Sequence, residues 1–239
     1  MNNSTHHFPR LYCSDFRKNF DSLDLSENQS HYLKNVLRKK TGDKIRIFNS
    51  EQGEWLTEIK TESKKGVTLN CLKQIRPPNL DSIQRHLIFS PIKKDRQDFL
   101  IEKAVELGVT HLHPVLFARS IIRDIKPERI TSQIIEAAEQ CERMTIPILS
   151  PILDLKKKLK DWNKNLLIYA AIERSNVPAL ITHSPFTHDC TFLVGPEGGI
   201  TEDENKLFSK MNYIHPISLG KNILRSETAA LYGLSCLGH

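Results

Sequence analysis

Three reactive side chains stand next to one another near the end of the sequence: Arg225, Ser226 and Glu227. A guanidinium can stabilise negative charge that develops on a substrate, and a carboxylate can accept a proton. The hydroxyl of Ser226 is typical of a helix N-cap, with a catalytic hydrogen bond as the alternative. The trio follows a predicted strand over residues 214–220 and opens a predicted helix over residues 226–237. The sequence therefore predicts a catalytic site at this strand-to-helix junction.

A second junction carries the glycine-rich segment GPEGG, residues 195–199, between a predicted strand and a predicted helix. Glycines let a backbone approach a flat ligand, and loops that leave the carboxyl ends of parallel strands line the ligand crevice of such sheets. The spacing matches neither common phosphate-binding motif, and Glu197 would repel a phosphate. We therefore expect a neutral or cationic ligand, with a tight turn that binds nothing as the alternative.

Strands and helices alternate from residue 85 to the end of the chain. Pattern and spacing predict strands over 85–92, 111–117, 165–172, 191–195 and 214–220, and helices over 95–108, 127–143, 201–211 and 226–237. Thr201 and Glu204 have the spacing of a capping box at the start of one helix. This alternation predicts an α/β fold in which helices cover both faces of a parallel sheet.

The first third of the chain has a different periodicity of apolar residues. Residues 43–50, 54–61 and 66–75 alternate with a period of two between turns, which predicts a small antiparallel β-barrel. A helix is expected over residues 28–40, with one apolar face and several cations on its other sides or at its end: the apolar residues are Tyr32, Leu33, Val36 and Leu37, and the cations include Lys34, Arg38 and Lys39. Pro77 and Pro78 interrupt the pattern, so we expect one domain over 1–76 and another over 77–239.

The positive charge is concentrated in this first third. Residues 1–80 hold 14 Lys and Arg against 9 Asp and Glu, whereas residues 81–239 hold 20 against 19. The imbalance favours an N-terminal module that binds a polyanion, with a merely soluble basic surface as the alternative. No apolar run reaches the ~18 residues of a membrane span, and no signal-peptide pattern is present, so a cytoplasmic protein without a membrane partner is expected.

Cysteine and histidine spacing gives no metal site. None of the five cysteines lies in a C-x-x-C pair, and the HLHP segment at residues 111–114 has no nearby cysteine or acidic cluster to complete a ligand set. Glu136, Glu139 and Arg143 have the spacing of an exposed, ion-paired helix face, although Gln140 and Arg143 could instead point towards the crevice.

The two junctions resemble one known family. The stretches LVGPEGGITEDE (193–204) and ISLGKNILRSETAA (217–230) resemble the RsmE family, the 16S ribosomal RNA uracil-N3 methyltransferases of the SPOUT class. Residues 31–49, 92–120 and 134–147 agree as well, so the resemblance covers nearly the whole chain. It implies a PUA-like N-terminal barrel for RNA binding, and a methyltransferase domain with a trefoil knot near its C-terminus. It also implies S-adenosylmethionine as the methyl donor, 16S rRNA within the assembled small subunit as the partner, and a homodimer.

The resemblance implies a cofactor pocket built from three loops, over residues 169–175, 195–199 and 219–224. Backbone groups of these loops would read the adenine edge, and Ile223 and Leu224 would cover its faces. The cofactor-binding residues implied are Ala171, Glu173, Val194, Gly195, Pro196, Glu197, Gly198, Gly199, Leu219, Gly220, Asn222, Ile223 and Leu224.

The resemblance also suggests roles for the reactive trio and for the basic module. Arg225 would stabilise the uracil anion, while Glu227 would either accept the N3 proton, directly or through water, or orient Arg225. The expected RNA contacts are Arg10, Lys34, Arg38 and Lys39, and the helix over 226–237 could supply dimer contacts through Ala229, Ala230, Leu234 and Leu237. Two other functions stay open: a non-catalytic RNA-binding assembly factor, and a SPOUT methyltransferase for another RNA base.

Overall fold

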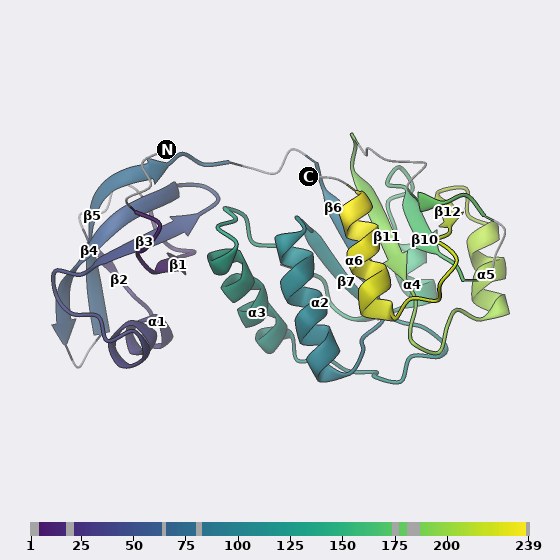
Figure 1. Ribbon diagram of the computed structural model, residues 1–239, viewed down its shortest axis with the longest axis horizontal. Coiled ribbons are helices and arrows are strands. Elements are labelled where there is room, and N and C mark those ends of the chain that lie inside the picture. Colours follow the sequence, from purple (N-terminus) through teal and green to yellow (C-terminus); the bar gives the residue numbers. More distant parts are fainter. Residues whose placement is uncertain are drawn as a thin grey trace. The chain divides into compact units, whose positions relative to one another are not determined.

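The computed structural model divides the chain into two compact units (Figure 1). It describes residues 5–17, 22–63, 66–79, 83–173, 177–180 and 187–237. One unit comprises Met1–Leu80 together with Ala138–Thr145, and the other comprises Asp81–Ala137 together with Ile146–His239. The predicted division at residue 76 therefore has to be amended, because a short segment from the second half of the chain packs within the first unit.

The first unit is built on a five-stranded sheet. Its order is β1 (Arg10–Tyr12), β3 (Lys44–Asn49), β4 (Gly53–Ser63), β5 (Gly66–Arg76) and β2 (Ser22–Asp24). The pair β1 and β3 is parallel and the other pairs are antiparallel, so the expectation of a purely antiparallel barrel is wrong for that pair. The pattern missed β1 and β2 because a strand of three residues is too short to show alternation.

The helix expected over residues 28–40 is shorter and of two kinds. An α-helix, α1 (Glu27–His31), opens with a capping box formed by Ser26 and Gln29, and a π-helix, η1 (Tyr32–Val36), continues it. Leu33 is fully buried, but Tyr32 is 38% exposed and Val36 is 59% exposed. The wider turn of a π-helix rotates successive side chains away from the face that an α-helix would bury. The predicted apolar face therefore holds for Leu33 and fails for Tyr32 and Val36.

The second unit contains the predicted parallel sheet. Its strand order is β12 (Ile214–Ile217), β10 (Ile168–Ala171), β11 (Cys190–Val194), β6 (Arg85–Phe89), β7 (His111–Leu116) and β8 (Ile148–Leu149), and β9 (Leu153–Asp154) also pairs with β7. Every pair in this sheet is parallel, as the alternation predicted. The carboxyl ends of these strands therefore lie along one edge of the sheet.

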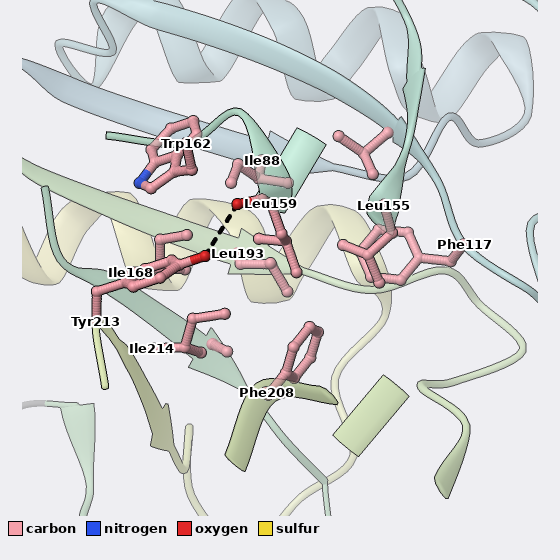
Figure 2. Packing of buried hydrophobic residues seen from close by; sticks show 12 residues of the cluster. Ile88, Phe117, Leu155, Leu159, Trp162, Ile168, Leu193, Phe208, Tyr213 and Ile214 are labelled. Carbon is pink, nitrogen blue, oxygen red and sulfur yellow. Dashed lines mark hydrogen bonds between the residues drawn. The ribbon is translucent and has the colours of Figure 1, made fainter. Parts of the chain in front are cut away.

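Helices cover both faces of this sheet, and neighbouring residues of β11 show the two sides. The helices are α2 (Lys94–Glu106), α3 (Pro127–Gln140), α4 (Leu155–Lys160), α5 (Glu202–Ser209) and α6 (Ser226–Cys236). Leu193 packs in an apolar cluster with side chains of α4 and α5, such as Leu159 and Phe208 (Figure 2). Phe192 points to the other face, where a Cβ added at Gly233 of α6 would lie 2.3 Å from its Cε1. A larger residue at 233 would push α6 off the sheet, so this glycine sets the close approach of the two elements.

The trefoil knot implied by the resemblance stays a prediction. Among the described residues, no helix is both long enough and apolar enough to cross a membrane.

Candidate functional site

A hydrogen bond joins the two junctions that the sequence singled out. The Oγ of Ser226, the first residue of α6, donates to the backbone oxygen of Gly195, which follows β11, over 3.0 Å. The N-cap of α6 is Arg225, and no side chain caps this end, so the expected N-cap role of Ser226 is wrong. Its hydroxyl instead ties the start of α6 to the glycine-rich loop and brings both loops into one site.

The glycine-rich loop is a compact turn. The amide of Gly199 donates to the oxygen of Pro196 over 2.9 Å, and Gly199 has a φ of +76°, which side chains other than glycine rarely adopt. A Cβ at Gly198 would lie 3.1 Å from the Cβ of Arg119, which leaves little room for a larger residue. Pro196 is buried. The loop therefore presents backbone, with few side chains in the way, to whatever lies at this edge of the sheet.

The predicted capping box after this loop is confirmed, and its carboxylate also binds a second loop. The hydroxyl of Thr201 accepts from the amide of Glu204, and Glu204 Oε2 accepts from the amide of Thr201 over 2.8 Å. The other oxygen, Oε1, accepts from the amide of Ala118 over 2.8 Å. Glu204 is buried, so this carboxylate fixes the loop after β7 against the start of α5.

Arg96 of α2 is a member of the site that the sequence analysis missed. Its guanidinium pairs with Glu197 of the glycine-rich loop, and its Nε lies 3.8 Å from Oε1 of Glu227. The sequence did hold a signal, since α2 follows β6 and its first turn must therefore lie at the carboxyl edge of a parallel sheet. Arg96 holds two carboxylates of like charge next to each other by lying between them.

Glu227 is paired with Arg96, and no interaction with Arg225 accompanies this pairing in the described part of the chain. The alternative in which Glu227 orients Arg225 therefore has no support. The Glu227 side chain is only 10% exposed, and its Oε2 is buried without a hydrogen-bond partner among the described residues. Arg225 is exposed, and its side chain makes no hydrogen bond or ion pair there. Among the described residues, the Arg225 guanidinium is thus free to contact a substrate, whereas Oε2 of Glu227 is an acceptor without a partner that lies below the surface.

The other predicted cofactor residues lie along the ends of β10, β11 and β12. Because β10 pairs with both β11 and β12, these three ends are neighbours. The segment 177–180 lies beside the end of β12, since the amide of Leu180 donates to the oxygen of Ser218 over 3.0 Å. Residues 174 and 175 of the expected first loop lie outside the described residues. By exposure, Val194 and Pro196 are buried, Ala171, Gly195, Gly199, Leu219 and Leu224 are half-buried, and Glu173, Glu197, Gly198, Gly220, Asn222 and Ile223 are exposed.

Arg10 does not present its side chain to a partner. It is 6% exposed; its Nη1 donates to the oxygen of Ala138 and its Nη2 to that of Arg143, both over 2.8 Å. Its Nε lies 3.2 Å from Glu54, an ion pair outside hydrogen-bond geometry, and its guanidinium lies 3.4 Å from the centroid of the Phe48 ring. Burial lowers the pKa of Arg10, against the effect of Glu54. The expected RNA contact is therefore corrected to a structural role.

Glu139 and Arg143 also differ from their expected roles. Oε1 of Glu139 accepts from the amide of Tyr12 over 2.8 Å, and Nε of Arg143 donates to the hydroxyl of Thr145 over 2.8 Å. These contacts lie within the first unit, where residues 138–145 pack. The orientation towards the crevice is therefore wrong for Arg143, and the exposed helix face is wrong for both residues, because each is half-buried.

The other three predicted RNA contacts lie at or near the surface of the barrel. Lys34 donates to the oxygen of Ser63 over 2.8 Å at an exposed position, Arg38 is exposed with a φ of +53°, and Lys39 is half-buried. Their part in RNA binding stays a prediction.

His113 of the HLHP segment belongs to a largely buried hydrogen-bonded row, whereas His111 contacts the hydroxyl of Thr110 and stacks on His86. No group of three or more possible metal ligands occurs among the described residues. Lys158 Nζ lies 2.9 Å from His113 Nδ1, His113 Nε2 lies 3.0 Å from His86 Nδ1, and His86 Nε2 lies 3.3 Å from Gln84 Oε1. With both imidazoles neutral, each of these contacts has one donor and one acceptor. Burial lowers the pKa of His86 to about 4 and that of His113 to about 2.

This row predicts a loss of stability in mild acid. The unfolded chain binds a proton at each of these histidines near pH 6.5, whereas the folded chain does not until about pH 4 or below. The contribution of these neutral histidines to the free energy of unfolding is complete above pH 6.5 and falls as the pH drops towards 4. Between pH 7.5 and 5.5 the free energy of unfolding is expected to fall by about 1–3 kcal/mol, measured by urea unfolding. The variant His113→Asn should lose about half of this pH dependence, whereas the control His31→Asn, at an exposed position, should keep all of it. An unaltered dependence of the free energy of unfolding on pH in His113→Asn would contradict the prediction.

The comparisons with known proteins match both units. Residues 79–238 match the family model of an RNA methyltransferase domain, and residues 25–70 match that of an RNA methyltransferase PUA domain. The chain is 35% identical to the ribosomal RNA small subunit methyltransferase E of Rickettsia conorii, over 95% of this chain and 94% of the relative. It is 27% identical to the protein of the same name from Bacillus subtilis, over 91% and 90%.

Solved structures agree with these relatives. A ribosomal RNA small subunit methyltransferase E from Neisseria gonorrhoeae, bound to S-adenosylmethionine, has a TM-score of 0.85 at 31% identity, with 96% of each chain covered. A structure from Legionella pneumophila in complex with the same cofactor has a TM-score of 0.86 at 26% identity, with 95% of this chain and 96% of that chain covered.

Proposed function

Because the chain belongs to the ribosomal RNA small subunit methyltransferase E family, we propose that it methylates N3 of a uridine in 16S rRNA with S-adenosylmethionine as donor. The observation that carries this proposal is the hydrogen bond from Ser226 to Gly195, because it joins the two motif-bearing loops in one site. Relatives of this chain that share its fold have been solved with the same cofactor bound.

The residues at this edge suit a sulfonium ligand. Bound there, S-adenosylmethionine supplies an electrophilic methyl group and carries no phosphate. Oε2 of Glu227 is a buried acceptor without a partner among the described residues, and such atoms normally receive a hydrogen bond from a ligand or water. Gly220 has a φ of +113°, and no described residue comes within 4 Å of a Cβ built there. The proposed binding residues are the cofactor set given above, supported by Arg96 through Glu197.

The reaction asks two things of the protein. Uracil N3 carries a proton and becomes a good nucleophile once that proton is lost, so a base and an anion-stabilising group are needed. The free guanidinium of Arg225 can stabilise charge on a uracil oxygen, and Oε2 of Glu227 can accept the proton directly or through water. Arg96 holds Oε1 of Glu227 and so leaves Oε2 for this task. Holding donor and nucleophile in line can lower the activation free energy by a further ~7–11 kcal/mol in favourable cases.

Removing the hydroxyl of Ser226 tests the joint between the loops. Ser226→Ala leaves the oxygen of Gly195 without its donor, and such a hydrogen bond contributes about 0.5–1.5 kcal/mol. We expect the Kd for S-adenosylmethionine, measured by calorimetry, to rise about 2–10-fold. Ser235→Ala is the matched control, since its exposed hydroxyl donates to the oxygen of Tyr232 within the same helix. An unchanged Kd in Ser226→Ala would show that the hydrogen bond between the two loops does not shape the pocket.

A methylation assay tests the function directly. The purified protein is incubated with S-adenosylmethionine carrying a labelled methyl group and with small ribosomal subunits that lack the modification. We expect labelled 3-methyluridine in digested 16S rRNA. A different methylated nucleoside would favour a methyltransferase for another RNA base. Absence of cofactor binding and of methyl transfer would favour the non-catalytic assembly factor.

We also propose that the protein is a cytoplasmic homodimer and that it acts on the assembled small subunit. The expected dimer residues need correction, because Ala229, Ala230 and Leu234 of α6 and its C-cap Leu237 are all buried within their own unit. Tyr232 of the same helix is 38% exposed and is the better candidate for a contact between copies. Light scattering of the purified protein gives the mass of the assembly in solution.

A further inference from the structure

The loop between β7 and α3 places exposed cations beside the glycine-rich loop. Nη1 of Arg119 donates to the oxygen of Gly198 over 3.1 Å. Farther along, Ile121, Arg123 and Lys126 are exposed, and Ile121 is 68% exposed. The loop follows the carboxyl end of β7 and so belongs to the same edge of the sheet as the proposed cofactor pocket.

The base of this loop is held by buried hydrogen bonds. The amide of Phe117 donates to the hydroxyl of Ser120 over 2.9 Å, and that hydroxyl lies 2.8 Å from the hydroxyl of Ser90. The amide of Ala118 donates to the buried carboxylate of Glu204. The start of the loop, up to Ser120, is therefore fixed, which lowers the entropy that the loop loses when a partner binds the side chains that follow.

The charge of the loop is out of proportion to that of its unit. Residues 118–126 hold the cations Arg119, Arg123 and Lys126 against the single carboxylate of Asp124, while residues 81–239 as a whole hold 20 cations and 19 anions. Asp124 accepts from the amide of Ile125 over 2.8 Å. Neither Arg123 nor Lys126 has an ion-pair partner in the described part of the chain. Two unpaired cations next to a large exposed apolar side chain match an RNA strand, which offers phosphates and the faces of unpaired bases.

We propose that the β7–α3 loop binds the rRNA strand that carries the target uridine, with Arg123 and Lys126 on its phosphates and Ile121 against an unstacked base. A base must leave its stack to reach the methyl group, and apolar side chains are known to fill the space that opens. This inference rests on the proposed function and adds to it a second RNA-binding surface, on the methyltransferase unit itself.

The test is the salt dependence of binding to small ribosomal subunits that lack the modification. Each phosphate contact contributes roughly 0.7–0.9 to the slope of log K against log salt concentration. The double variant Arg123→Ala/Lys126→Ala is expected to lower the magnitude of that slope by about 1.4–1.8 and to raise the KM for subunits about tenfold or more, with kcat and the Kd for S-adenosylmethionine unchanged. Ile121→Ala should raise the KM without changing the slope.

A matched control removes the same charge elsewhere. Lys160 and Lys164 are exposed and precede β10, at the opposite edge of the sheet, so Lys160→Ala/Lys164→Ala is expected to behave as wild type. Equal slopes for the loop variant and wild type would overturn the inference, as would an equal reduction in the control. A wild-type protein that neither binds S-adenosylmethionine nor methylates subunits would instead overturn the proposed function.

Discussion

Arg225→Ala is expected to lower kcat for methyl transfer to the small subunit by about 10²–10³-fold. The guanidinium is exposed at the start of α6 and makes no hydrogen bond or ion pair with the described residues. Because this cation has no partner among the described residues, it can stabilise a substrate anion without breaking a contact within the protein. Its removal should therefore affect the reaction and leave the fold intact. The measurement is single-turnover transfer of labelled methyl groups, with the Kd for S-adenosylmethionine measured in parallel.

Two comparisons make this prediction specific. Arg225→Lys keeps the charge but loses the planar fork, so we expect it to recover part of the rate. Lys206→Ala removes a cation from the exposed side of α5 and should leave kcat as it is in the wild-type protein. If Arg225→Ala transfers methyl groups at the wild-type rate, another group stabilises the uracil anion. If it instead loses affinity for S-adenosylmethionine alone, Arg225 belongs to the cofactor pocket.

Glu54→Gln is expected to lower the free energy of unfolding of the barrel by about 3–5 kcal/mol. The Glu54 side chain is fully buried and lies 3.1–3.2 Å from the guanidinium groups of Arg10, Arg46 and Arg76. Without its charge, the buried Arg10 and Arg46 have lost their common partner, and an uncompensated buried charge is strongly destabilising. Urea unfolding followed by the fluorescence of Trp55, which lies in β4, measures the change.

The matched control is Glu62→Gln on the same strand. Glu62 is exposed, so its replacement should change the free energy of unfolding by less than about 0.5 kcal/mol. Equal stability of Glu54→Gln and wild type would mean that carbonyl oxygens and Glu142 satisfy the three arginines without Glu54. The same cluster explains why residues 138–145 pack with the barrel, since Arg46 also pairs with Glu142 over 2.8 Å and Arg76 donates to its backbone oxygen.

Much of the second unit could be read from the sequence, because local rules decide it. Alternating apolar strands and amphipathic helices predicted the parallel sheet, and Thr201 with Glu204 predicted the start of α5 correctly. Both depend on residues close together in the chain. The carboxyl-edge rule then placed the loops that contain Gly195 and Leu224 at one edge without any knowledge of their contacts.

The errors arose where long-range contacts decide the outcome. Arg10 was expected to contact RNA on the strength of the family resemblance. Its actual partners, Glu54 and the oxygens of residues 138 and 143, are more than 40 residues away in the chain and could not be read from the sequence. Arg96 was overlooked for the same reason, since Glu197 and Glu227 are about 100 or more residues distant.

The sequence alone determined the fold class, the order of its elements and the two loops with the means for chemistry, because periodicity and motif spacing are local properties. The tertiary structure alone decided which charges are free to act. A guanidinium serves structure or substrate according to whether a buried carboxylate lies within about 4 Å of it, and that depends on packing between distant segments. Arg10 is committed in this way to Glu54, and Arg225 is not.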